Sequence, residues 1–288
     1  MLDKKIAFIG SGAMAEAMIS GLLRQKLARP ENLRASDTRN ERVEELHEKY
    51  GVEPFTDNNR AVEQADVIVL SVKPQRLTEV LGNLKEAVPP AAVVLSIVAG
   101  ATIDKISNGL KHTAVVRSMP NTPAQIGEGI TVWIASPSVS EAQKETARTI
   151  LSALGEEVNV DDENYLDMAT ALSGTGPAYV FIFMEAMIDA GVHMGFSRRV
   201  SEQLVIQTLK GSVDYYQAVN QKSSVHVAAL KNQVTSPGGT TAEALYYLEK
   251  AGFRTAISRA IWAAYQRSLE LGREKPVHIP ENNNGNEK

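Results

Sequence analysis

The sequence predicts an α/β fold for its first half and an all-α fold for its second half. From residue 4 to about residue 160, short apolar runs alternate with amphipathic segments, which is typical of βαβ units and a parallel sheet. From about Asp162 that alternation stops and long segments with a 3.6-residue period begin. The 288 residues suffice for two domains, each with its own core. We therefore expect domains at residues 1–161 and 162–275, followed by a tail at 276–288.

Apolar runs predict the strands of the first domain, with helices between them. The strands are expected at residues 4–10, 32–36, 66–72, 92–98, 113–119, 129–135 and 155–160. The helices are expected near 13–26, 39–49, 74–86, 102–109 and 140–153. Six or seven strands at this spacing predict a doubly wound sheet, in which ligands bind at the carboxyl ends of the strands.

A glycine motif follows the first predicted strand directly. The stretch "AFIGSGAMAEAM" places Gly10, Gly12 and Ala15 in the pattern G-x-G-x-x-G/A at the start of a helix. Gly10 permits the tight turn, Gly12 allows the backbone to approach a pyrophosphate, and Ala15 allows close helix packing. A glycine turn without a ligand is the alternative, but the strand-to-helix position favours a Rossmann-type dinucleotide-binding domain.

The end of the second predicted strand bears on the choice between NAD and NADP. In "RASDTRNE", Ser36, Thr38 and Arg39 are suited to a 2′-phosphate, whereas Asp37 is suited to a free ribose 2′-hydroxyl. We favour NADPH, with NADH possible, because Arg39 offers charge-assisted bonds to a phosphate. The alternative is that Arg39 is simply an exposed charge.

Three further segments are expected at the same edge of the sheet. "SVKPQ" begins at Ser71 and "SIVAG" at Ser96, and both end strands that should line the cofactor. Lys73 precedes a proline, so we expect it to fix a loop and point its ammonium at ribose or phosphate rather than act in proton transfer. "RSMPNTPA" holds Asn121 between two prolines, a rigid polar loop that could orient a nicotinamide or a small substrate, although rigid turns also serve folding alone.

The second domain contains a polar, glycine-rich segment, "VTSPGGTTAEAL", from Val234 to Leu245. A glycine-rich turn at a helix start offers unpaired N–H groups and the favourable end of the helix dipole, which together bind an anion such as a carboxylate. Ser236, Thr240 and Thr241 add hydroxyl groups. A simple helix cap would explain one Ser or Thr but not the two adjacent glycines.

The same domain also contains a helix that is apolar on almost all sides, "PAYVFIFMEAMIDAGVHMG", from Pro177 to Gly195. Such a helix is buried on most faces, which favours a homodimer through an all-α helical dimerisation domain. Coverage by other helices of the same chain is the alternative.

Composition excludes several other classes of function. The net charge is −4 with scattered Lys and Arg, so we expect no nucleic-acid partner. The chain has no cysteine and five separated histidines, so we expect no disulfide, thiolate or metal site. A strand begins within a few residues of the N-terminus and no apolar run approaches the roughly 18 residues of a membrane span, so we expect a cytoplasmic protein with no membrane partner. The polar stretch 276–288 is expected to be a disordered tail.

Taken together, five motifs in order resemble the pyrroline-5-carboxylate reductase family over residues 1–273. They are "GSGAMAEA" at Gly10, "SVKP" at Ser71, "MPNTP" at Met119, "SGTGPAYVF" at Ser173 and "VTSPGGTTAEAL" at Val234. The resemblance implies hydride transfer from NAD(P)H to the C=N carbon of a cyclic imine that carries a carboxylate, with L-proline as product.

The resemblance also implies site residues. Substrate contacts are expected at Ser236, Gly238, Gly239, Thr240, Thr241, Pro120 and Asn121, with the hydroxyl of Thr241 bonded to the ring nitrogen as the catalytic group. Dinucleotide contacts are expected at Ile9, Gly10, Ser11, Gly12, Ala13, Met14, Ser36, Arg39, Asn58, Ser71, Val72, Lys73, Pro74, Val98, Ala99 and Gly100. Members of the family form dimers through interlocked helical domains, and some assemble further into decamers of five dimers.

The chain departs from the family pattern at three positions, and two alternative functions are a β-hydroxyacid dehydrogenase and a regulatory paralogue. Val227 follows His226 where the family has a proline, Ser224 stands where some relatives have an acidic residue, and Thr175 replaces a commoner serine. A β-hydroxyacid dehydrogenase would need a lysine on the long apolar helix, and residues 173–191 contain none. A regulatory paralogue without catalysis would show damage at Thr241 or the glycines, and both are intact.

Overall fold

The computed structural model describes residues 1–272, so the predicted tail and the last residues of the predicted second domain lie outside the described part. The chain divides into two compact units. The first consists of residues 1–174 together with the segment from Ala264 onward, and the second of residues 175–263. The predicted boundary at residue 161 stays a prediction.

The first unit is built on one sheet with the strand order β3-β2-β1-β4-β5-β6-β7-β8. Strands β1 to β6 are mutually parallel wherever they pair, whereas β7 runs antiparallel to β6 and β8 runs parallel to β7. The strands are β1 (Ile6–Ile9), β2 (Leu33–Ser36), β3 (Glu53–Phe55), β4 (Val67–Leu70), β5 (Val93–Ser96), β6 (Val115–Met119), β7 (Gly129–Ala135) and β8 (Gly155–Asn159).

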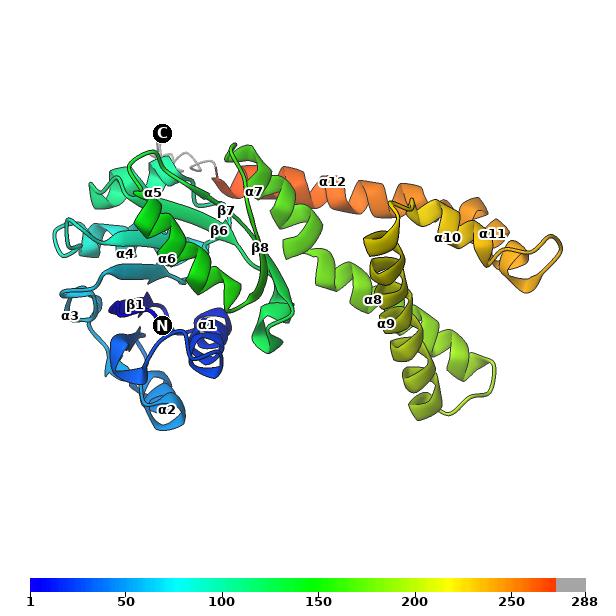
Figure 1. Cartoon of the computed structure of the whole chain (residues 1–288), viewed down its shortest axis with the longest axis horizontal. Helices are drawn as coiled ribbons and strands as arrows, with labels where there is room; N and C mark the ends of the chain where they lie inside the picture. Colours follow the sequence, from blue (N-terminus) through cyan, green and yellow to red (C-terminus); the bar gives the residue numbers. More distant parts are fainter. Residues whose placement is uncertain (273–288) are drawn as a thin grey trace, which may run out of the picture. The chain divides into compact units, whose positions relative to one another are not determined.

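Helices cover both faces of this sheet, as Figure 1 shows. In β1, Ile6 and Phe8 join one buried cluster while Ala7 and Ile9 join the other, because successive side chains of a strand point to opposite faces. The first cluster includes residues of α1 (Ala13–Arg24), α2 (Asn40–Tyr50) and α6 (Glu141–Ser152). The second includes residues of α3 (Asn58–Val62), α4 (Pro74–Leu84) and α5 (Ile103–Leu110). The predicted doubly wound architecture is confirmed.

Among the strands of the sheet and the helices that connect them, β3 and α3 were not predicted. Strand β3 has three residues and contains Pro54, and α3 is a single short helix capped by the side chain of Asp57. The sheet therefore has eight strands rather than the expected six or seven. The remaining predicted strands and helices are present, most of them shortened at their ends.

The rest of the described chain is helical. A short helix, α7 (Asn164–Ala169), and a π-helical turn, η3 (Thr170–Gly174), end the first segment of unit 1. The second unit contains α8 (Gly176–His193), α9 (Arg198–Lys222), α10 (Val227–Gln233), α11 (Thr240–Lys250) and the first part of α12 (Phe253–Gly272). Single 3-10 turns lie at η1 (Pro30–Asn32) and η2 (Thr122–Ile126).

Helices α8 and α9 pack against each other, but much of α8 stays open to solvent in the single chain. A Cβ placed on Gly191 of α8 would lie 2.6 Å from the hydroxyl of Ser201 on α9, so a small residue is needed at this crossing. Phe181 and Ile182 remain 61% and 65% exposed. Among the described residues, the run Asn164–His193 is the one helical segment whose length and composition would allow it to cross a membrane, which the sequence had not led us to expect.

Candidate functional site

A cavity of about 710 Å³ lies in the first unit where four parallel strands end. Its walls come from residues at or after the ends of β1, β2, β3 and β4, together with the start of α3 and residues along α4. Nine of the predicted dinucleotide contacts line it: Gly10, Ser11, Gly12, Ser36, Arg39, Asn58, Ser71, Val72 and Lys73. The carboxyl edge of a parallel sheet is where this architecture binds ligands, so the cavity is the candidate nucleotide site.

The glycine loop has the geometry that the motif predicts. Gly10 has a φ of +90°, and a Cβ at this position would lie 2.8 Å from Val72 Cγ1 and 2.9 Å from the carbonyl oxygen of Ser71. Any other residue would therefore be strained and would collide with Ser71 and Val72, which follow β4. At Gly12, by contrast, a Cβ would meet nothing within 4 Å, so the backbone is open to a ligand.

The carboxylate of Asp37 is engaged by its neighbours. Arg39 Nε lies 3.1 Å from Oδ1 and Nη2 lies 3.4 Å from Oδ2, while the N–H of Ser11 donates to Oδ2 at 3.2 Å. Burial raises the pKa of Asp37, but hydrogen bonds from Arg39 and Ser11 outweigh burial and lower the pKa below its usual value. The two groups that distinguish a 2′-hydroxyl from a 2′-phosphate thus form one ion pair at the cavity wall.

Two other predicted contacts are bonded to each other. The hydroxyl of Ser36 donates to Asn58 Oδ1 at 2.7 Å, which joins the end of β2 to the start of α3. Asn58 lies in a helix too short to recognise by periodicity, yet the family resemblance had selected it.

The other predicted dinucleotide contacts do not line this cavity. Ile9 is fully buried in the sheet, and Gly100 lies against Leu271 of α12. Five others are also absent from the lining and lie either next to lining residues or just after β5: Ala13, Met14, Pro74, Val98 and Ala99. Their contacts with a nucleotide stay predictions.

Sequence reasoning did not select several residues that line the cavity. One of them is Arg76, whose side chain is 60% exposed, pairs with Glu79 at 3.2 Å and places a positive charge at the wall of the cavity. Its position in the sequence could have indicated this, because Arg76 lies in the first turn of α4, the helix that begins at Pro74. The others are Thr56, Asp57, Asn59, Glu79, Val80 and Asn83.

Asn121 has a well-defined structural role in the first unit. Its side-chain Oδ1 accepts the N–H of Ile130 at 3.0 Å, and its Nδ2 donates to the carbonyl oxygen of Ser173 at 3.2 Å. The amide therefore ties the loop after β6 to β7 and to the π-helical turn. Pro120 beside it is buried. These bonds account for the side chain of Asn121 without a ligand, and its contact with substrate stays a prediction.

In the second unit, the segment before α11 is arranged as an open helix start. Gly239 is the N-cap and gives no side-chain cap, so the first N–H groups of the helix are left for another partner. Gly238 has a φ of +69°, and a Cβ on Gly239 would collide with the hydroxyl of Ser236. Thr240 and Thr241 occupy the first turn, with Thr240 exposed and Thr241 half-buried. The two glycines are thus required by the turn itself.

Family comparisons match both halves of the chain. Residues 163–271 match the family described as "Pyrroline-5-carboxylate reductase dimerisation". Residues 5–100 match the family described as "NADP oxidoreductase coenzyme F420-dependent". The second match covers the glycine loop and the whole lining of the cavity.

Individual proteins match the chain over nearly its full length. The pyrroline-5-carboxylate reductase of Synechocystis sp. is 39% identical, over 94% of this chain and 99% of the relative. The enzyme of the same name from Pseudomonas aeruginosa is 40% identical, over 95% and 99%. The crystal structure of Plasmodium falciparum pyrroline carboxylate reductase with NADP bound has a TM-score of 0.86 at 34% identity and covers 95% of this chain and 100% of that chain.

Proposed function

This chain belongs to the pyrroline-5-carboxylate reductase family, and from that premise we infer that it uses NAD(P)H to reduce 1-pyrroline-5-carboxylate to L-proline, the last step of proline biosynthesis. The observation that carries the inference is the cavity at the carboxyl edge of the sheet, whose glycine loop is shaped for a dinucleotide. The reaction adds a hydride to the imine carbon and a proton to the ring nitrogen, so the C=N bond becomes a C–N single bond.

The residues of the cavity fit a dinucleotide. The open backbone at Gly12 and the start of α1 suit a pyrophosphate, and the polar ends of β2 and α3 suit the adenosine ribose. When bound, the reduced nicotinamide supplies the hydride. Ser36 and Arg39 are proposed to hold the 2′-phosphate of NADPH, with Arg76 as an additional cation.

The start of α11 is proposed to hold the substrate. The N–H groups after Gly238 and Gly239, with the hydroxyls of Ser236 and Thr240, bind the carboxylate, because the helix dipole favours an anion there. The hydroxyl of Thr241 then bonds to the ring nitrogen and orients the imine for hydride addition. Pro120 and Asn121 shape the loop that is proposed to lie near the nicotinamide and substrate.

The chain forms oligomers, as its match to a dimerisation family indicates. We propose a homodimer, with a decamer of five dimers as the larger assembly, and a cytoplasmic location. The exposed apolar surface of α8 supports a subunit interface, which also accounts for the apolar composition of the run Asn164–His193.

The function is tested by following the loss of nicotinamide absorbance with purified protein and racemic pyrroline-5-carboxylate, first with NADPH and then with NADH. Rapid oxidation that depends on the imine is expected. A folded protein that oxidises neither cofactor would contradict the proposal and favour a paralogue without catalysis.

Cofactor preference is tested in the same assay with Arg39→Ala. The NADPH-to-NADH ratio of kcat/KM is expected to fall about tenfold, the effect of one charge-assisted bond to a phosphate. Arg148→Met on α6 serves as the control, because its guanidinium pairs with Glu145 and Glu157 outside the cavity. An unchanged ratio in Arg39→Ala would make Arg39 only an exposed partner of Asp37.

A further inference from the structure

The side chain of Arg42, on α2, contacts the backbone of the glycine loop. Arg42 lies in the first turn of this helix, and its Nε donates to the carbonyl oxygen of Ser11 at 2.7 Å. The side chain is only 14% exposed and does not line the cavity. Arg42 therefore contacts the loop without reaching the place where a nucleotide binds.

The bond from Arg42 fixes the direction of one peptide group. The carbonyl of Ser11 and the N–H of Gly12 belong to the same planar trans peptide and point in opposite directions. Because the carbonyl is held toward α2, the N–H of Gly12 is turned the other way. Gly12 is exposed and lines the cavity, and the loop N–H groups of this motif are those that bind a pyrophosphate.

Ser11 is held at its other polar atoms as well. Its N–H donates to Asp37 Oδ2 at 3.2 Å, and its buried hydroxyl donates to the carbonyl oxygen of Ser36 at 3.1 Å. The hydrogen bond from Arg42 is therefore the third that Ser11 makes, and it fixes the peptide group between Ser11 and Gly12.

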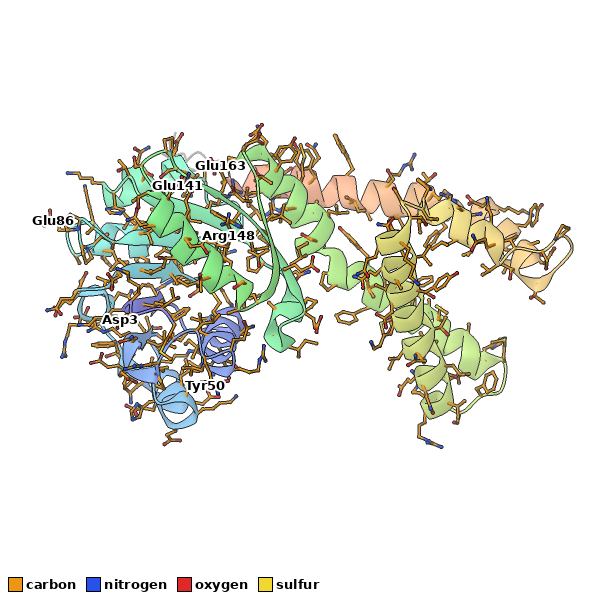
Figure 2. The ribbon with its side chains drawn as sticks, in the orientation of Figure 1. Asp3, Tyr50, Glu86, Glu141, Arg148 and Glu163 are labelled. Carbon is orange, nitrogen blue, oxygen red and sulfur yellow. The ribbon has the colours of Figure 1, made fainter. Side chains whose placement is uncertain are left out.

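Arg42 is itself held by Glu16, in the first turn of α1. Glu16 accepts hydrogen bonds from Arg42 Nη2, from Lys49 Nζ at 2.8 Å and from the hydroxyl of Tyr50, labelled in Figure 2, at 3.0 Å. The third guanidinium nitrogen, Nη1, binds Glu45 at 2.8 Å. Every nitrogen of the guanidinium is therefore engaged, which fixes its orientation.

We propose that Arg42, oriented by Glu16, is a positioning residue for dinucleotide binding that presents the N–H of Gly12 to the pyrophosphate. The proposal rests on the proposed function, since it assumes that NADP(H) occupies the cavity. It goes beyond that function by assigning pyrophosphate affinity to a side chain that does not touch the cofactor.

The test compares two ligands in wild type and Arg42→Met: NADP⁺, which carries the pyrophosphate, and 2′-AMP, which has the adenosine and 2′-phosphate but no pyrophosphate. We expect the Kd of NADP⁺ to rise about tenfold or more while the Kd of 2′-AMP changes less than twofold. In steady state, the KM for NADPH should rise while kcat at saturating NADPH stays within about twofold. Equal weakening of both ligands, or of neither, would overturn the proposal.

Controls separate this role from a loss of folding or of the cofactor site. Glu45→Gln neutralises the exposed partner of Arg42 and should leave both Kd values unchanged. Glu16→Gln keeps the shape of the side chain but weakens its hold on Arg42, so it should shift only the Kd of NADP⁺, in the same direction and by less. If circular dichroism shows that Arg42→Met is poorly folded, the Kd of NADP⁺ in Glu16→Gln tests the proposal instead. An unchanged NADP⁺ Kd in that variant would overturn the proposal. Wild type that binds neither ligand would instead contradict the proposed function.

Discussion

The hydroxyl of Thr241 lies in the first turn of α11 and is the one group proposed to act on the reacting nitrogen. Thr241→Ala removes this hydroxyl and should lower kcat by about one to three powers of ten without loss of stability, because the rest of the site still positions the substrate. Steady-state kinetics and thermal unfolding check both statements. Thr241→Ser, which keeps the hydroxyl, is the control and should retain most of the rate. A normal rate in Thr241→Ala would show that the residue only begins the helix.

The carboxylate of Glu16 makes the stability of the folded protein depend on pH. Burial opposes its charge, but hydrogen bonds from Lys49, Arg42 and Tyr50 prevail and lower the pKa from 4.5 to about 2. The folded state therefore favours the charged carboxylate, so the resulting stability is complete above about pH 4.5 and is lost as the pH falls toward 2.

Glu16→Gln should consequently be less stable than wild type at pH 7, with the difference shrinking between pH 4.5 and 2. Urea unfolding of both proteins at pH 7, 4 and 3 measures this. A constant difference across that range would mean that the charge of Glu16 contributes nothing to stability.

Residue identity alone predicted the glycine loop but not the side chains that support it. Gly10 and Gly12 are recognisable because the motif is local and follows a strand. Arg42 and Arg76 were not recognisable, because a charged residue in the first turn of a helix is usually a solvated one, and their roles depend on which loop each helix faces. Asn121 was selected because of its rigid loop, and the bonds of its amide to Ile130 and Ser173 became visible only in the structure, so its contact with a ligand stays a prediction.

At the scale of elements, a buried charged cluster joins β6 to α7 and α12. Arg117 is 3% exposed and pairs with Glu163, labelled in Figure 2, at 2.8 Å and with Asp167 at 3.3 Å. Asp167 also accepts the hydroxyl of Ser268 at 2.6 Å. The cluster holds both ends of the helical region, where α7 leaves the sheet and α12 returns to it.

Arg117→Met should lower the free energy of unfolding by about 3 kcal/mol, because it leaves the buried carboxylate of Asp167 without its counter-charge. Urea unfolding measures the change. Arg148→Met, which removes two partly exposed ion pairs, should cost about 1 kcal/mol or less. If Arg117→Met matched that control, the cluster would not hold these elements.

Elements with a clear apolar run or period were predicted, whereas β3 and α3, which lack one, were not. The strand β7 was predicted at its observed bounds because its apolar run is long. Strand β3 escaped notice because three residues with a proline give no alternation, and the structure tolerates Pro54 because β3 is the edge strand. The antiparallel direction of β7 was not predicted, although the connection between β6 and β7 is shorter than the dozen or so residues that a parallel crossover needs.

At the scale of the whole molecule, the account requires oligomerisation through the helical region. Phe181→Arg places a charge on an exposed apolar face of α8 and should weaken self-association at least about 30-fold, the loss expected for a buried apolar anchor at an interface. Sedimentation over a concentration series measures it. Glu86→Arg, on the first unit and labelled in Figure 2, is the charge-change control and should associate normally. Normal association of Phe181→Arg would place the interface elsewhere.

The most direct test of the central claim is to measure L-proline formed against NADPH consumed, with wild-type protein and racemic pyrroline-5-carboxylate. We expect one L-proline for each NADPH consumed and no product when the imine is omitted. NADPH consumption without proline, or a folded protein that forms no proline with either NADPH or NADH, would contradict the assignment of this chain as a pyrroline-5-carboxylate reductase.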